Sequence, residues 1–203
     1  MDPTYFYKNI NLDITHRCKL QCHKCMRQEY PGLHKRGHDI SLKSFKKICK
    51  QFKHITLCGQ MGDCIYHPKF IELMLIGKRI PMLVETNGFG KSLGWWSKAF
   101  SFKNITWCFA LDGLPKDSHK YRKNQNGEDV FEIMKYGVRL GAKVIWNYIV
   151  FKYNENDISV AKELAEKYNI TFNLVMSSRW DKNDSFKPSK YFLEDYRNYE
   201  AVS

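Results

Sequence analysis

Six short apolar runs alternate with amphipathic segments along this chain, and that alternation restricts the possible folds more than any other feature. The runs expected to form strands are residues 9–15, 54–57, 81–85, 105–111, 143–151 and 170–175. The expected helices are 41–52 capped by Ser41, one begun by Pro68, 92–100, 129–140 ended by Gly141, 154–168 and, more weakly, 189–199. Strands that alternate with helices pair in parallel through right-handed crossovers. The sequence therefore predicts an α/β fold with a parallel sheet.

The length of the chain narrows this prediction. A complete eight-fold barrel takes about 250 residues, whereas this chain has 203. An open, partial (β/α)6 TIM-like barrel fits the length better. We expect residues 1–180 to form the core domain, and the polar and aromatic residues 181–203 to form a C-terminal tail that packs on it.

The sequence also indicates the cellular compartment of the protein. No apolar run approaches the roughly 18–20 residues that a membrane-spanning helix needs. The first residues lack the basic-then-apolar pattern of a secretory signal. We therefore expect a cytoplasmic protein with no membrane partner. In a reducing compartment, the seven cysteines indicate metal ligands or free thiols rather than disulfides, and Cys49 and Cys108 are expected in the core.

Three of the cysteines are closely spaced just after the first expected strand. Cys18, Cys22 and Cys25 follow the pattern C-x3-C-x2-C. Three thiolates on one loop can hold three irons of a 4Fe–4S cluster and leave the fourth iron open to a ligand. A zinc site completed by His16 or His23 is an alternative, as are three unrelated thiols.

Polar motifs follow or lie within the other expected strands. They are GQMGD at 59–63, ETNG at 85–88, Asp112-Gly113, Asn147 within the fifth strand, and the MSSR segment at 176–179. In parallel α/β folds the chemistry lies at the carboxyl ends of the strands. An asparagine inside so apolar a strand needs a partner if it is buried, and a ligand would supply one. Individually these motifs are also ordinary turns, so their common position is the informative observation.

The cysteine triplet and the ordered motifs together resemble the radical S-adenosylmethionine (SAM) superfamily over about residues 9–180. The resemblance implies a partial barrel, a 4Fe–4S cluster on Cys18, Cys22 and Cys25, and SAM at the open iron. It implies an enzyme that reductively cleaves SAM to a 5′-deoxyadenosyl radical, which abstracts hydrogen from a substrate. A reductant such as flavodoxin or ferredoxin is implied as a partner. The short length is similar to that of a compact phage or viral enzyme.

The resemblance also implies which residues contact SAM. The segment GQMGDCIYHP is similar to the family's G-x-x-G-D-P-x-x-H-P, with Cys64 in place of the first proline. Its backbone and its acidic residue would receive the methionine ammonium group. The residues expected to bind the cofactor are Gly59, Gln60, Gly62, Asp63, Thr86, Asn87, Asp112, Asn147 and Met176. Lys24 departs from the family, which often has an aromatic residue before the third cysteine.

The charge of the chain bears on the substrate. The net charge is +12, and residues 16–54 hold eleven Lys or Arg against two acids. A basic rim favours an anionic substrate such as a nucleotide or nucleic-acid base, although a solvated basic helix explains the excess equally well. The candidate substrate contacts are Lys24, Arg27, His119, Arg122 and Arg179. The rival interpretations are a radical SAM enzyme that modifies peptides or proteins, and a zinc-dependent nucleic-acid-binding module without catalysis. The sequence assigns no catalytic residue.

Overall fold

A computed structural model describes residues 8–34, 37–177, 180–181 and 183–189. In this part of the chain, six parallel strands form one sheet in the order β1-β2-β3-β4-β5-β6. The strands are β1 (Asn9–Leu12), β2 (His54–Leu57), β3 (Met82–Thr86), β4 (Ile105–Ala110), β5 (Lys143–Ile149) and β6 (Thr171–Val175). The predicted parallel α/β fold with six strands is confirmed, and the strands pair in chain order.

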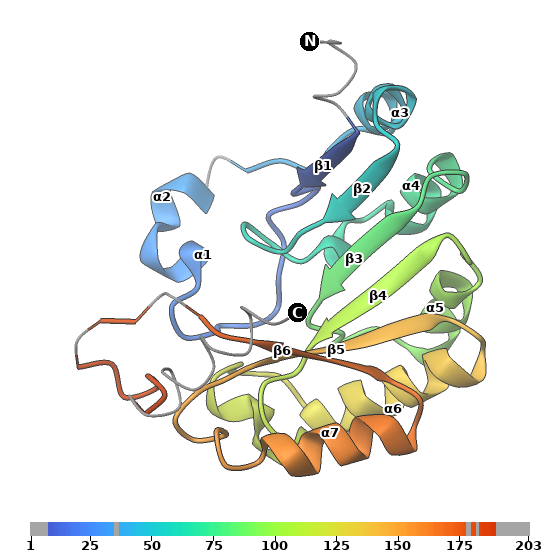
Figure 1. Ribbon diagram of the computed structural model, residues 1–203. Helices are drawn as coiled ribbons and strands as arrows, with labels where there is room; N and C mark the ends of the chain where they lie inside the picture. The colour runs from blue at the N-terminus through green and yellow to red at the C-terminus, as the bar shows by residue number, and fades with distance from the viewer. Residues whose placement is uncertain (1–7, 35–36, 178–179, 182, 190–203) are drawn as a thin grey trace, which may run out of the picture.

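The helices connect successive strands. They are α1 (Met26–Glu29), α2 (Pro31–His34), α3 (Leu42–Gln51), α4 (Phe70–Ile76), α5 (Leu93–Phe100), α6 (Gly127–Arg139) and α7 (Ile158–Lys167), with the short 3-10 helices η2 (Cys64–Tyr66) and η3 (Pro115–Lys120). Figure 1 shows α3 to α7 along the outside of the curved sheet, whereas α1 and α2 lie off the carboxyl ends of the strands. The loop after β1 therefore crosses the end of the sheet where ligands bind in such folds.

The helix ends follow from local hydrogen bonds. The Ser41 hydroxyl accepts a hydrogen bond from the Ser44 N–H at 3.0 Å, which confirms the predicted cap of α3. Gly141 follows α6 in the left-handed region at φ +74°, which also agrees with the prediction. The fourth helix begins at Phe70 instead of Pro68, because the His67 ring accepts a hydrogen bond from the Lys69 N–H at 3.0 Å and holds a turn there.

The last long helix also starts later than predicted. The Asn154 side chain is buried, accepts from the Phe151 N–H at 2.7 Å and donates to the Ile149 carbonyl at 3.0 Å. These bonds hold the chain in a turn after β5, so α7 begins at Ile158. An asparagine that satisfies the backbone in this way competes with the first turn of a helix.

The core lies between the sheet and the outer helices. Trp96, Trp107 and Phe109 are each fully buried, and the Trp96 and Trp107 rings lie 5.4 Å apart. Burying each such side chain contributes on the order of 2–3 kcal/mol. Successive strand residues point to opposite faces, so the residues that alternate with the buried ones along each strand face the concave interior of the barrel. Glu85 and Asn147 are two of them, and both are half-buried.

The described part of the tail lies against the core. The Phe186 carbonyl accepts a hydrogen bond from the Lys152 N–H at 3.0 Å, and the Phe186 ring lies 6.0 Å from that of Phe151. The division at residue 180 stays a prediction. The weak helix predicted at 189–199 falls, beyond Ser189, outside the described residues. No helix among the described residues is long and apolar enough to cross a membrane.

Candidate functional site

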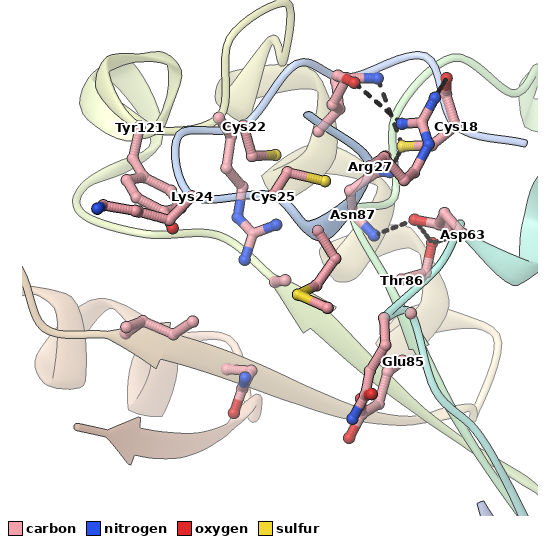
Figure 2. Close-up of a pocket in the computed structure, with 18 of the residues that line it drawn as sticks. Cys18, Cys22, Lys24, Cys25, Arg27, Asp63, Glu85, Thr86, Asn87 and Tyr121 are labelled. Carbon is pink, nitrogen blue, oxygen red and sulfur yellow. Dashed lines mark hydrogen bonds between the residues drawn. The ribbon is translucent and has the colours of Figure 1, made fainter. Parts of the chain in front are cut away.

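The carboxyl ends of the strands and the loop after β1 enclose a cavity of about 300 Å³. Cys18, Cys22 and Cys25 all line it, and each is a free, half-buried thiol. Figure 2 shows the three cysteines on one side of this cavity. The structure therefore brings the three predicted ligands together at the predicted end of the sheet.

The cysteine loop is held in shape by backbone contacts. The Arg27 guanidinium donates to the carbonyls of Leu20 and Cys18, both at 3.3 Å, and so closes the loop on itself. The N–H of His23 donates to the Tyr121 carbonyl at 3.2 Å, which ties the loop to the segment after β4. Arg27 was predicted as a substrate contact, but its guanidinium is hydrogen-bonded to the loop that carries the cysteines.

Burial disfavours the charged thiolate form of two of these cysteines. Burial raises the pKa of Cys18 to about 12 and also raises that of Cys22, where the charge of Arg122 opposes the effect. Buried thiols lose their protons when a cation compensates the charge, as an iron cluster does. Among the described residues, no three His, Cys, Asp or Glu side chains gather at the spacing of a single metal ion. In a 4Fe–4S cluster each cysteine binds a different iron, so three sulfurs around one cavity fit it.

The Asp63 carboxylate is held by hydrogen bonds within the protein. It accepts from the Asn87 N–H at 2.6 Å, from the Thr86 hydroxyl at 2.9 Å and from the Ile65 N–H at 3.2 Å. Asp63 is only 4% exposed. Burial raises the pKa of its carboxyl group, and these hydrogen bonds oppose the rise. The carboxylate thus ties the loop after β2 to the end of β3, and the predicted contact with an ammonium group would have to compete with these donors.

The glycines before Asp63 have different roles. A Cβ on Gly62 would lie 2.2 Å from the Thr15 carbonyl oxygen, so only glycine fits at this contact with the start of the cysteine loop. Gly59 and Gln60 are exposed and line the cavity. They are therefore accessible to a ligand, and their contact with SAM stays a prediction.

The Thr-Asn-Gly segment after β3 connects this bend to the cysteines. The Asn87 side-chain amide donates to the Cys18 sulfur at 3.5 Å, and Asn87 is 5% exposed. Figure 2 shows Asp63, Thr86 and Asn87 beside Cys18. The bend after β2, the end of β3 and one of the predicted metal ligands therefore form a continuous hydrogen-bonded unit.

The Asp112 carboxylate is paired with the neighbouring Arg122 side chain. It is fully buried, and its carboxylate lies 2.7 Å from Nε of Arg122 and accepts from the Ile149 N–H at 3.1 Å. Burial raises the pKa of Asp112, and the Arg122 charge opposes the rise. Arg122 lines the cavity, whereas Asp112 is not part of its wall. Asp112 was predicted to bind the cofactor, but in the structure its carboxylate forms an ion pair that orients Arg122.

Of the other residues predicted to contact the cofactor or substrate, some line the cavity and others do not. Asn147 lines the cavity, and its side-chain oxygen accepts from the Asn173 amide at 2.6 Å. Met176 packs against the core instead. His119 is exposed on η3 and does not line the cavity. Arg179 lies outside the described residues.

Lys24 binds the C-terminal segment. Its ammonium group pairs with Asp181 and lies 3.6 Å from Asp184. The hydrogen bond to Asp181 raises the pKa of Lys24. The neighbouring His23 ring lies 4.7 Å from that of Phe186. At the position where the family often has an aromatic residue, this chain therefore has an ion pair to its own tail, and the ammonium is engaged.

Several residues of the cavity wall were given no role by the sequence analysis, although two of them lie in motifs that it named. They are Glu85, Cys108, Tyr121, Phe151 and Ser177. Cys108 was expected only in the core. Glu85 stands one residue before the Thr-Asn-Gly segment, and a charged residue at the carboxyl end of a parallel strand was the available signal.

The fold is shared with several solved structures. Streptococcus suis SuiB bound to S-adenosylmethionine has a TM-score of 0.74 at 15% identity, over 97% of this chain and 48% of that chain. The structure of anSMEcpe with bound AdoMet and Kp18Cys peptide has a TM-score of 0.70 at 13% identity, over 94% of this chain and 59% of that chain. Methylornithine synthase (PylB) has a TM-score of 0.62 at 14% identity, over 91% and 55%.

This chain spans about half the length of these structures. No family model and no curated protein matches its sequence. The structural similarity therefore shows a shared fold and nothing more. It is a partial (β/α)6 barrel with parallel strands, the fold that the sequence resemblance implied.

Proposed function

We propose that this chain is a radical SAM enzyme in which Cys18, Cys22 and Cys25 hold a 4Fe–4S cluster. The observation that carries the proposal is that the three cysteines of one loop line a single cavity at the carboxyl ends of a six-stranded parallel barrel. When bound, the reduced cluster supplies the electron that cleaves SAM to a 5′-deoxyadenosyl radical. A reductant such as flavodoxin or ferredoxin is part of this proposal.

The residues of the chain have distinct tasks in it. The exposed backbone at Gly59 and Gln60 and the side chain of Asn147 are available to bind and orient SAM. Arg122 places a positive charge near Cys22 and favours its thiolate form. The Tyr121 and Phe151 rings stack at 4.1 Å and form an apolar part of the cavity wall. Such a wall excludes water, which protects a reactive carbon radical from side reactions.

The substrate class is a separate question. The predicted anionic substrate would need free cations, but Lys24, Arg27 and Arg122 are engaged by carboxylates or carbonyls of the chain itself. A peptide or protein substrate is the second candidate. It is favoured because the same fold occurs in SuiB bound to its precursor peptide SuiA and in anSMEcpe bound to a peptide.

The class of enzyme is tested by anaerobic purification, iron and sulfide analysis, and incubation with dithionite and SAM. We expect about four irons per chain and formation of 5′-deoxyadenosine, detected by chromatography. Cys22→Ser should lose both. Cys49→Ser is the matched control, since Cys49 lies on α3 outside the cavity and should retain both. A colourless protein with about one zinc per chain and no 5′-deoxyadenosine would contradict the proposal and favour the zinc module.

The substrate classes are separated in the same assay. Many enzymes assemble their active state only when the correct substrate is bound. We therefore expect the rate of SAM cleavage to rise with substrate, and we would compare oligonucleotides and nucleotides with peptide libraries. Stimulation by peptides alone would support the second candidate.

A further inference from the structure

The cavity contains a carboxylate that the protein leaves without a partner. Glu85 lies on β3 between Val84 and Thr86, which are both buried, so its side chain faces the concave interior of the barrel. It lines the cavity and is half-buried. No described residue forms a hydrogen bond or an ion pair with the Glu85 carboxylate.

The second carboxylate in the described cavity wall is compensated. Asp63 accepts the hydrogen bonds of Asn87, Thr86 and Ile65. Behind the wall, Asp112 is paired with Arg122. A ligand that enters the cavity therefore meets uncompensated negative charge at Glu85. A half-buried carboxylate without a partner is costly, and a cation at this point would relieve the cost.

The surroundings of Glu85 increase this negative character. The Asp13 carboxylate, at the end of β1, accepts from the Met61 N–H at 3.2 Å, and its charge acts on Glu85. Burial first, and then the Asp13 charge, raises the pKa of Glu85. The thiols of Cys58 and Cys108 lie near Glu85. Burial first, and then the neighbouring carboxylates, raises the pKa of both thiols, and the Arg122 charge opposes the rise at Cys108. Neither thiol supplies a positive charge.

The position of Glu85 separates it from the metal ligands. Figure 2 shows Glu85 at the opposite end of the cavity from Cys18, Cys22 and Cys25, and its side chain extends away from them. A cofactor held at an open iron would be attached at the cysteine end of the cavity. The glutamate is therefore placed to contact a second molecule that enters the barrel interior.

We propose that Glu85 is a specificity-determining residue that recognises a cationic group of the substrate, an alkylammonium or a guanidinium. This inference rests on the proposed function and names the substrate chemistry of the same site. The charge-assisted bond between carboxylate and cation fixes which end of the substrate lies deep in the barrel. An anionic substrate group is excluded from this end by the same charge.

The test compares two isosteric probes, 1,5-diaminopentane and 1,5-pentanediol, by calorimetry on the reconstituted protein saturated with SAM and without reductant. We expect the diamine to bind about tenfold or more tightly than the diol, as one partly buried charge pair provides. Glu85→Gln keeps the size of the side chain and should bring the ratio close to one. Glu163→Gln is the control, since Glu163 is exposed on α7, and it should keep the wild-type ratio.

Two results would overturn the inference while the enzyme still cleaves SAM. In the first, the wild type binds the diol as well as the diamine, or Glu85→Gln keeps the preference. In the second, Glu85→Gln weakens SAM binding in the absence of a probe, which would assign the glutamate to the cofactor. Formation of 5′-deoxyadenosine by the wild type is measured in parallel. Its absence would overturn the proposed function, and a cation preference found without it would not concern a substrate.

Discussion

The role of Asp63 can be decided by a single substitution, Asp63→Asn. The carboxylate accepts from the N–H groups of Asn87 and Ile65 on its two oxygens and from the Thr86 hydroxyl. An asparagine replaces one of these oxygens with an NH2 group, which then faces a backbone donor. A buried donor left without an acceptor costs about 1–3 kcal/mol, and the loss of a charged acceptor adds about 1 kcal/mol. We therefore expect the free energy of unfolding to fall by about 2–4 kcal/mol.

The measurement is denaturant unfolding of the metal-free protein in reducing buffer, followed by circular dichroism. Asp129→Asn is the matched control, since Asp129 is exposed in the first turn of α6 and its loss should cost less than about 1 kcal/mol. The reasoning is refuted if Asp63→Asn unfolds like the wild type and instead weakens SAM binding. That result would show that the carboxylate is free to receive the ammonium group, as the sequence resemblance implied.

Three further perturbations test other parts of the site. Gly62→Ala should lower the free energy of unfolding by about 1–3 kcal/mol or more, because the new Cβ meets a backbone carbonyl. Gly94→Ala, with open space around it, should raise the free energy of unfolding by up to about 1 kcal/mol, and equal effects of the two substitutions would contradict the steric argument. Arg122→Met should lower the free energy of unfolding by about 3–5 kcal/mol, since it leaves Asp112 buried and unpaired. Adding Asp112→Asn should restore most of that stability in the same unfolding assay, and an Arg122→Met variant as stable as the wild type would argue against the ion pair. The cation binds ionised Glu85, whose pKa is raised above 4.5, so the affinity for the diamine should be full above that pKa and should be lost as the pH falls through it. Calorimetry of Glu85→Gln should show an affinity that does not change with pH, and a wild-type affinity that does not change with pH would contradict the assignment.

The fold was predictable because its signal is local and repeated. Each strand is a short apolar run and each helix an amphipathic one, and parallel pairing in chain order follows from their alternation. The errors fall at element ends. There a side chain such as that of Asn154 or His67 binds the backbone and delays the helix, which periodicity does not detect.

The site was predictable only where its chemistry is local in sequence. Cys18, Cys22 and Cys25 stand on one loop, so their spacing was enough to predict that they share a cavity. By contrast, Lys24 pairs with Asp181, which is 157 residues away. No pattern in the sequence indicates such a partner, and without it a lysine beside the cysteines is easily interpreted as a contact for an anion.

The same distinction applies to the charge of the chain. The basic excess of residues 16–54 suggested an anionic substrate, but much of it is carried by α3 on the outside of the barrel. There Lys43, Lys46 and Lys50 line a groove with Lys78 and Arg79, and this groove shares no residue with the cavity. Charge on the outer helices produces a long-range field, which affects how fast molecules approach the protein. What binds inside depends on the charges that remain uncompensated there, and Glu85 contributes the opposite sign.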